Sequence, residues 1–229
     1  MLTYRIVKNI LVTFNKIFFR WRFDGLENIP RRGPLIVAGN HISYFDPLCQ
    51  GYMVVKAKRQ PRFFAKSELW RNPFLRFILS HARQIPVQRG TGESGPVEKA
   101  IDALGQGNVV MIYPESTITT NADLTPMQGK TGVARVALAT GAPVVPIAVW
   151  GSHWVKPKRR RARQKLGRLI VLKAGEPMRF DEALLARADD PEVLRDVTDQ
   201  VMAELDRLVR ELHKVYPEGA AVPELREQL

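Results

Sequence analysis

The sequence of 229 residues is poor in cysteine, in acidic side chains relative to basic ones, and in uninterrupted apolar sequence at its N-terminus. The single cysteine, Cys49, excludes an internal disulfide framework and is typical of a reducing compartment, so we expect it to be a small buried hydrophobe. Residues 1–20 are broken by charges throughout, whereas a spanning helix needs about 20 predominantly apolar residues. They also lack a small-residue cleavage site, which excludes a signal peptide.

Basic side chains outnumber acidic ones by 35 to 23, and the formal net charge is +12. Such an excess favours a negatively charged partner, either nucleic acid or an anionic membrane surface. The N-terminus favours the membrane, because a helix drawn at about 100° per residue gathers apolar and aromatic side chains on one arc of roughly 160°. The arc holds Tyr4, Ile6, Val7, Ile10, Leu11, Phe14, Ile17 and Phe18. We therefore expect a helix in the plane of the interface; a helix packed on the protein's own core is the alternative.

A second basic feature lies at residues 156–165, where seven of ten side chains are cationic. Near an anionic leaflet each would contribute about 1 kcal/mol within a Debye length, so the run would hold the protein against a membrane. A solvated loop and a grip on a phosphate backbone are the alternatives. No nucleic-acid motif or interleaved aromatic set accompanies the run, so we expect no nucleic-acid partner.

Strand and helix patterns alternate along the chain, which is long enough for one domain with a substantial core. Strands are predicted at 21–25, 34–38, 62–65, 85–87, 109–113, 144–149 and 169–174. Helices are predicted at 47–55, 74–79, 97–104, 131–140 and 190–215, several of them stopped by glycine. The alternation predicts an α/β fold, a single domain with a mixed, mostly parallel sheet flanked by helices and with its site at strand ends.

The residues that point to chemistry are His41 and Asp46, separated by four residues just past the strand at 34–38. An imidazole takes a proton near neutral pH, and a nearby carboxylate can fix its tautomer and stabilise the imidazolium. The pair suits an enzyme that deprotonates a substrate hydroxyl so that its oxygen attacks a carbonyl. The alternative is structural: Asp46 would cap a helix that begins at Pro47, and His41 would bond to backbone.

Three further segments follow in a fixed order: Ile85-Pro86-Val87-Gln88-Arg89, Ile112-Tyr113-Pro114-Glu115-Ser116-Thr117 and Ala142-Pro143-Val144-Val145-Pro146-Ile147. With His41 and Asp46 they resemble the glycerolipid acyltransferase family, whose best known members are 1-acyl-glycerol-3-phosphate (lysophosphatidic acid) acyltransferases. The family's first block, a histidine and an aspartate separated by four residues, is matched without change, and Arg89 matches the arginine of its second. Four ordered blocks are far more specific than any one of them.

The resemblance implies an enzyme that moves a fatty acyl group from an acyl thioester to the free hydroxyl of 1-acyl-glycerol-3-phosphate, giving phosphatidic acid for phospholipid synthesis. His41 would be the general base, Asp46 would orient it, and Arg89 would bind the acceptor phosphate. The partners would be acyl-CoA or acyl carrier protein as co-substrate, the lysophospholipid, and an anionic membrane surface. Neither a metal nor another cofactor is implied.

The third block departs from the family's Pro-Glu-Gly-Thr-Arg and reads Pro114-Glu115-Ser116-Thr117-Ile118. Glu115, with Ser116 and Thr117, is expected to organise the acceptor or the site loop. Ser116 replaces a glycine and adds a Cβ where we expect a positive φ. Because Ile118 replaces a cation, we expect Lys130, at a helix N-terminus, to supply the second positive charge.

The acceptor stays open between the lysophospholipid and other hydroxyls, on glycerol-3-phosphate, another lysophospholipid or a glycolipid sugar. A non-catalytic basic membrane-binding module is the alternative outside the enzyme class. We expect three parts: an amphipathic membrane-associating helix at 1–20, the acyltransferase domain at 21–180, and a helical extension packed on it at 181–229. The expected location is the cytoplasmic face of the cell membrane, as a peripheral or monotopic protein.

Overall fold

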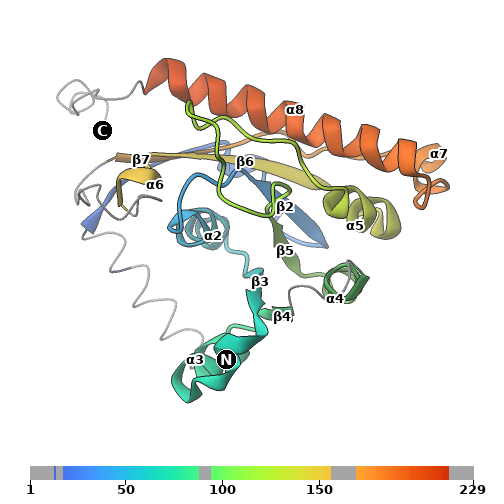
Figure 1. Ribbon diagram of the computed structural model, residues 1–229, viewed down its shortest axis with the longest axis horizontal. Coiled ribbons are helices and arrows are strands. Elements are labelled where there is room, and N and C mark those ends of the chain that lie inside the picture. The colour runs from blue at the N-terminus through green and yellow to red at the C-terminus, as the bar shows by residue number, and fades with distance from the viewer. Residues whose placement is uncertain (1–12, 14–17, 88–93, 156–168, 217–229) are drawn as a thin grey trace.

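The computed structural model describes residues 13, 18–87, 94–155 and 169–216, which form one sheet with helices on both faces (Figure 1). The strands are β1 (Arg20–Asp24), β2 (Leu35–Gly39), β3 (Pro61–Lys66), β4 (Ile85–Val87), β5 (Val109–Ile112), β6 (Val144–Trp150) and β7 (Leu169–Ala174). The α-helices are α2 (Asp46–Lys56), α3 (Pro73–His81), α4 (Ser94–Gly105), α5 (Gly132–Thr140), α6 (Ser152–Val155), α7 (Glu182–Leu185) and α8 (Pro191–Val215), and the 3₁₀ turns are η1 (Leu26–Asn28) and η2 (Ser67–Arg71).

These elements confirm the predicted strands and long helices, with ends that differ by a few residues. The amphipathic helix expected at 1–20 falls almost wholly outside the described residues, and so does the basic run at 156–165. Within the ranges that the structure describes, no helix is long and apolar enough to cross a membrane.

The seven strands lie in the order β1-β7-β6-β2-β5-β3-β4. All neighbours run parallel except β6 and β7, so the sheet is mixed and mostly parallel, as predicted. Every residue of β2 and β6 is buried. Continuous apolar runs of this kind are typical of central parallel strands covered on both faces.

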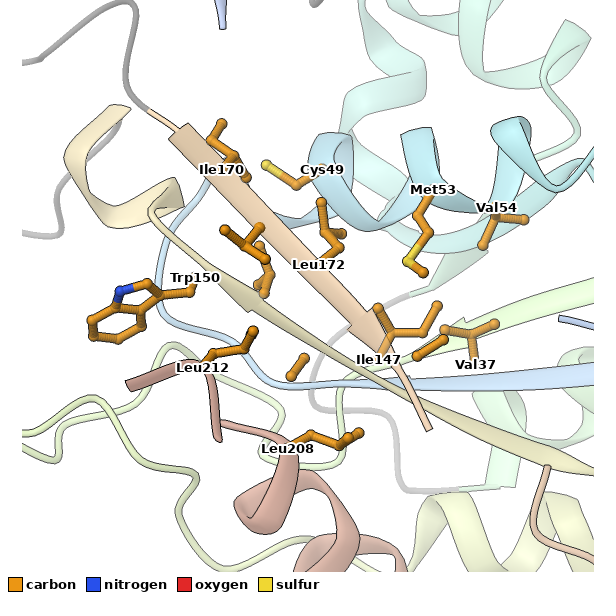
Figure 2. Packing of buried hydrophobic residues seen from close by; sticks show 14 of the residues in the cluster. Val37, Cys49, Met53, Val54, Ile147, Trp150, Ile170, Leu172, Leu208 and Leu212 are labelled. Carbon is orange, nitrogen blue, oxygen red and sulfur yellow. The ribbon is translucent and has the colours of Figure 1, made fainter. Parts of the chain in front are cut away.

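The core has a layer on each side of the sheet. Cys49 and Met53 of α2 pack on one face, and Leu208 and Leu212 of α8 pack on the other (Figure 2). α4 and α5 join α8 through a second buried cluster. α5 ends at Gly141, whose φ of 62° places it in the left-handed region, as the glycine stop predicted.

The sheet also determines where the site lies. β2 has β5 on one side and β6 on the other, both parallel to it. The carboxyl ends of these three strands therefore meet at one edge of the sheet, and the chain segments that follow them converge there.

Candidate active site

His41 and Asp46 are in direct contact at this carboxyl edge. Nδ1 of His41 lies 2.8 Å from Oδ2 of Asp46. The His41 side chain is 15% exposed, whereas that of Asp46 is fully buried. We assign the Nδ1 proton to the bond with the carboxylate, which leaves Nε2 as the ring nitrogen able to accept a proton.

The Asp46 carboxylate is fixed by further donors. Its Oδ2 also accepts from the backbone N–H of Ile42 at 2.6 Å and of Ser43 at 2.7 Å. Its Oδ1 accepts from the hydroxyl of Ser152 at 2.5 Å. α2 begins at Asp46 itself, and the two N–H groups that donate to the carboxylate, those of Ile42 and Ser43, precede the helix. The alternative in which Asp46 caps the helix is therefore wrong. A buried carboxylate with these bonds is held in place to orient the imidazole.

The backbone just before His41 is anchored to β6. Asn40 exchanges two hydrogen bonds with the backbone of Val149: its Oδ1 accepts at 2.8 Å and its Nδ2 donates at 3.2 Å. The Nε2 of Gln50 donates to the carbonyl of Asn40 at 3.0 Å. A Cβ at Gly39 would lie 2.0 Å from Oε1 of Gln50, so a larger residue there would displace the Gln50 side chain. The anchoring fixes the position from which His41 projects.

Glu115 joins the loops that surround the pair. Its Oε1 accepts from the N–H of His41 at 3.0 Å, and its Oε2 accepts from the N–H of Met127 at 2.9 Å. The carbonyl of His41 in turn accepts from the N–H of Thr119 at 2.7 Å. Glu115 is only 4% exposed, and burial raises the pKa of its carboxyl while the two amides oppose the rise. Glu115 thus joins the backbone at His41 to the backbone at Met127.

Two neutral side chains line the buried side of the pair. The rings of His41 and Tyr113 stack with centroids 4.5 Å apart. Burial and the nearby Asp46 raise the pKa of the Tyr113 phenol and of the Cys49 thiol well above their usual values. Cys49 is completely buried, which confirms the expected small hydrophobe. Both groups therefore stay protonated near neutral pH.

The third block forms a tight turn. Ser116 has a φ of 58°, in the left-handed region, as its place at a family glycine predicted. Ser116 and Thr117 are exposed. Ile118 is 4% exposed and packs inward, so the position where the family carries an arginine is closed here by an apolar side chain.

Of the two expected phosphate ligands, the structure places one. The N–H of Lys130 donates to the carbonyl of Pro114 at 2.9 Å, which brings it beside the third block, and its side chain is exposed. Lys130 precedes Thr131, the N-cap of α5. Arg89 lies outside the described residues. Among the described residues, no three His, Cys, Asp or Glu side chains gather where they could hold a metal ion.

Sequence reasoning missed Ser152, Asn40 and Tyr113. The signal for Ser152 was its position next to Gly151, just past the strand predicted at 144–149. Gly151 has a φ of 91°, and a Cβ there would lie 2.4 Å from the carbonyl oxygen of Leu169. The glycine lets the chain turn so that Ser152 faces Asp46.

A histidine oriented by a buried carboxylate at the carboxyl edge of this sheet is typical of an enzyme that activates a hydroxyl. The class is confirmed by comparison: the family model described as acyltransferase matches residues 20–150, more than half of the chain, so the chain belongs to this acyltransferase family.

The chain is similar to several proteins named as acyltransferases. The 1-acyl-sn-glycerol-3-phosphate acyltransferase of Borreliella burgdorferi is 31% identical over 131 residues, which cover 56% of this chain and 50% of that protein. The enzyme of the same name from Bacillus subtilis is 26% identical over 187 residues, covering 81% and 88%. The chain thus spans about half the length of the first relative and most of the second.

The fold is similar to that in the crystal structure of the 1-acyl-sn-glycerophosphate (LPA) acyltransferase PlsC from Thermotoga maritima. The TM-score is 0.67 at 24% sequence identity, and the match covers 91% of this chain and 80% of that one. This likeness supports the fold.

Proposed function

We propose that the protein transfers a fatty acyl group from an acyl thioester to the free hydroxyl of 1-acyl-glycerol-3-phosphate and so forms phosphatidic acid. The observation that carries the proposal is the 2.8 Å contact between Nδ1 of His41 and Oδ2 of Asp46. Membership of the acyltransferase family and the names of the similar proteins support the choice of substrates.

In the proposed reaction, His41 acts as the general base. Its Nε2 takes the hydroxyl proton as the acceptor oxygen attacks the thioester carbonyl carbon, and Asp46 stabilises the imidazolium. The tetrahedral intermediate then collapses and the C–S bond breaks. The departing thiolate takes the proton from His41, so the products are an ester and a free thiol.

The proposed transfer is direct, without an acyl-enzyme. Cys49 is fully buried and its thiol has a raised pKa, so it is a poor nucleophile. The hydroxyl of Ser152 is bonded to Asp46 rather than to a base that could activate it. The substrate hydroxyl itself is then the group that His41 activates.

The acceptor phosphate would be bound by Arg89 and Lys130. Lys130 is exposed beside the third block and precedes a helix N-terminus, which favours anions. Arg89 comes two residues after β4 in the sequence, and β4 runs parallel to its neighbour β3, so its carboxyl end lies on the same sheet edge as that of β2.

The residue at position 118, Ile118, favours a second candidate function. Because its buried apolar side chain replaces a cation of the family's third block, that block offers no positive charge to a phosphate. The second candidate is the same transfer to an acceptor with a neutral headgroup, such as the sugar hydroxyl of a glycolipid.

One assay separates the two candidates. Purified protein is incubated with labelled acyl-CoA or acyl carrier protein thioester and, in turn, with 1-acyl-glycerol-3-phosphate, the matched 1-acylglycerol without phosphate, glycerol-3-phosphate and a glycolipid. The proposal predicts phosphatidic acid as the main product, with little transfer to 1-acylglycerol. Transfer to the glycolipid alone would establish the second candidate, and no transfer to any acceptor would contradict both.

A further inference from the structure

The turn η2 and helix α3 form an apolar hairpin that lies outside the core (Figure 1). Five of the nine residues of α3 are large and apolar, yet the helix buries none of its side chains. Phe74 is 70% exposed, Phe77 is 49% exposed, and Leu69 of η2 is 39% exposed. Phe74 and Phe77 are three residues apart and so share one face of the helix. Large apolar side chains exposed together in this way mark an interaction site.

The hairpin is nevertheless well formed. Oδ1 of Asn72 caps α3 by accepting from the N–H of Phe74 at 3.0 Å and of Leu75 at 3.1 Å. Nε1 of Trp70 donates to the hydroxyl of Ser80 at 3.1 Å, which ties η2 to α3. At its base, Oε1 of Gln84 accepts from the N–H of Phe63 in β3 at 2.7 Å. The exposed rings therefore project from a fixed scaffold.

The charge around the rings is predominantly positive. α3 contains no acidic residue, and residues 67–83 carry Arg71, Arg76 and Arg83 against one acid, Glu68. All three arginines are exposed. Aromatic rings flanked by cations suit the boundary between headgroups and acyl chains of an anionic bilayer.

The hairpin also leaves the sheet at the edge that carries the site. η2 directly follows β3, which is parallel to β5, and β5 is parallel to β2, the strand that precedes His41. β3 lies two strands from β2, a separation of roughly 10 Å at the usual spacing between strands. The hairpin that carries Phe74 and Phe77 therefore begins at the same edge of the sheet as the segment that carries His41.

We propose that the η2–α3 hairpin is a lipid-contact element. Phe74 and Phe77 enter the acyl-chain boundary of an anionic bilayer, and Arg71 and Arg76 lie at its headgroups. That the contact serves delivery of a lipid acceptor to His41 rests on the proposed function, whereas the contact itself does not.

The test compares full-length wild type with the double variant Phe74→Ser, Phe77→Ser. Val215→Ser is the matched control, because Val215 is 62% exposed at the far end of α8. In sedimentation with phosphatidylglycerol–phosphatidylcholine vesicles, the partition coefficient of the double variant should fall roughly ten- to hundredfold, and that of Val215→Ser should not change. Thermal unfolding should change little in either variant, because the one ring contact that is removed, between Phe77 and the exposed His81, lies at the surface. Wild-type partitioning of the folded double variant would overturn the proposal.

The same proteins are assayed without vesicles, with a soluble short-chain thioester and a short-chain acceptor. Retained transfer by the double variant is expected. Absence of transfer by the wild type would contradict the proposed function but leave the partition result as it stands, so the two failures are distinguishable.

A labelled variant identifies the occupant of the surface. Phe77→Cys is modified with an environment-sensitive fluorophore, while the buried Cys49 does not react. Anionic vesicles should shift the emission to the blue, and brominated lipid should quench it. Shielding of the label without vesicles would overturn the proposal, in favour of residues 1–17 if it is independent of protein concentration and of a second copy if it grows with concentration.

Discussion

Ser152 donates its hydroxyl to Oδ1 of Asp46 at 2.5 Å, so the segment after β6 fixes the carboxylate that orients His41. The other oxygen of Asp46 is already bonded to His41 and to backbone N–H groups. Without Ser152, Oδ1 would lose a partner in a fully buried environment, and the orientation of the carboxylate would be less well defined.

We predict that Ser152→Ala lowers kcat about tenfold to a hundredfold, because hydrogen bonds to charged groups contribute about 1.5 to 3 kcal/mol. The acceptor KM should change little, since Ser152 acts through Asp46. Asp181→Ala is the control, because it removes the side-chain cap of α7 and no hydrogen bond to His41 or Asp46. Wild-type kcat in folded Ser152→Ala would show that the bond does not position Asp46.

Arg89→Ala and Lys130→Ala should each raise the KM for 1-acyl-glycerol-3-phosphate more than they lower kcat. A rise of about ten- to a hundredfold is expected if each charge binds the phosphate equally in the ground and transition states. Arg89→Lys should not restore the affinity, because an ammonium lacks the guanidinium fork. The control is 1-acylglycerol: equal impairment with this neutral acceptor would make the residues structural.

Ile118→Arg should not restore the family's missing cation. The Ile118 side chain is 4% exposed, so an arginine there would be an unpaired charge in the core. We expect the free energy of unfolding to fall by about 3 kcal/mol or more, against about 1 kcal/mol for Ile118→Val. Urea denaturation measures both. A stable Ile118→Arg protein with a lower acceptor KM would mean that this position faces the acceptor.

The pKa of Cys49 predicts a loss of stability at high pH. Burial raises this pKa well above its usual value, whereas the unfolded thiol titrates near about 8.5. The native state therefore holds the thiol proton more tightly than the unfolded state does. The resulting contribution to the free energy of unfolding is complete below about pH 8.5 and is lost as the pH rises toward the pKa of the folded state. In the wild type the free energy of unfolding should therefore decline by up to about 1.4 kcal/mol per pH unit, and Cys49→Ala should remove this decline.

Urea denaturation from pH 7 to pH 10 measures this decline. Tyr113, whose pKa is also raised, should leave a remaining decline above about pH 10 in the variant. Equal slopes for wild type and Cys49→Ala between pH 8.5 and 10 would show that the thiol does not titrate differently in the two states.

The fold could be predicted to a large extent because its signals are local. Strands such as β2 are short apolar runs bounded by turn residues, and α5 ends at Gly141, whose φ is positive. The contact between His41 and Asp46 followed from their short separation in the sequence, between the end of β2 and the start of α2. Local sequence could likewise predict the left-handed turn at Ser116 from its family position.

The remaining features depend on how distant segments meet. Ser152 reaches Asp46 only because β6 neighbours β2, and strand order cannot be derived from periodicity. The antiparallel direction of β7 depends likewise on its pairing with β6. The apolar pattern of α3 predicted a helix correctly, but it is the same for a helix that packs on a core and for one that faces outward.

The most direct measurement of the proposed chemistry is turnover of His41→Ala with a labelled acyl thioester and 1-acyl-glycerol-3-phosphate, at saturating concentrations of both. Loss of a general base should lower kcat by about 10²- to 10⁴-fold in a protein that remains folded, and Asp46→Asn should lower kcat while leaving acceptor binding largely intact. Wild-type turnover by folded His41→Ala would contradict the assignment of His41 as the base that activates the acceptor hydroxyl.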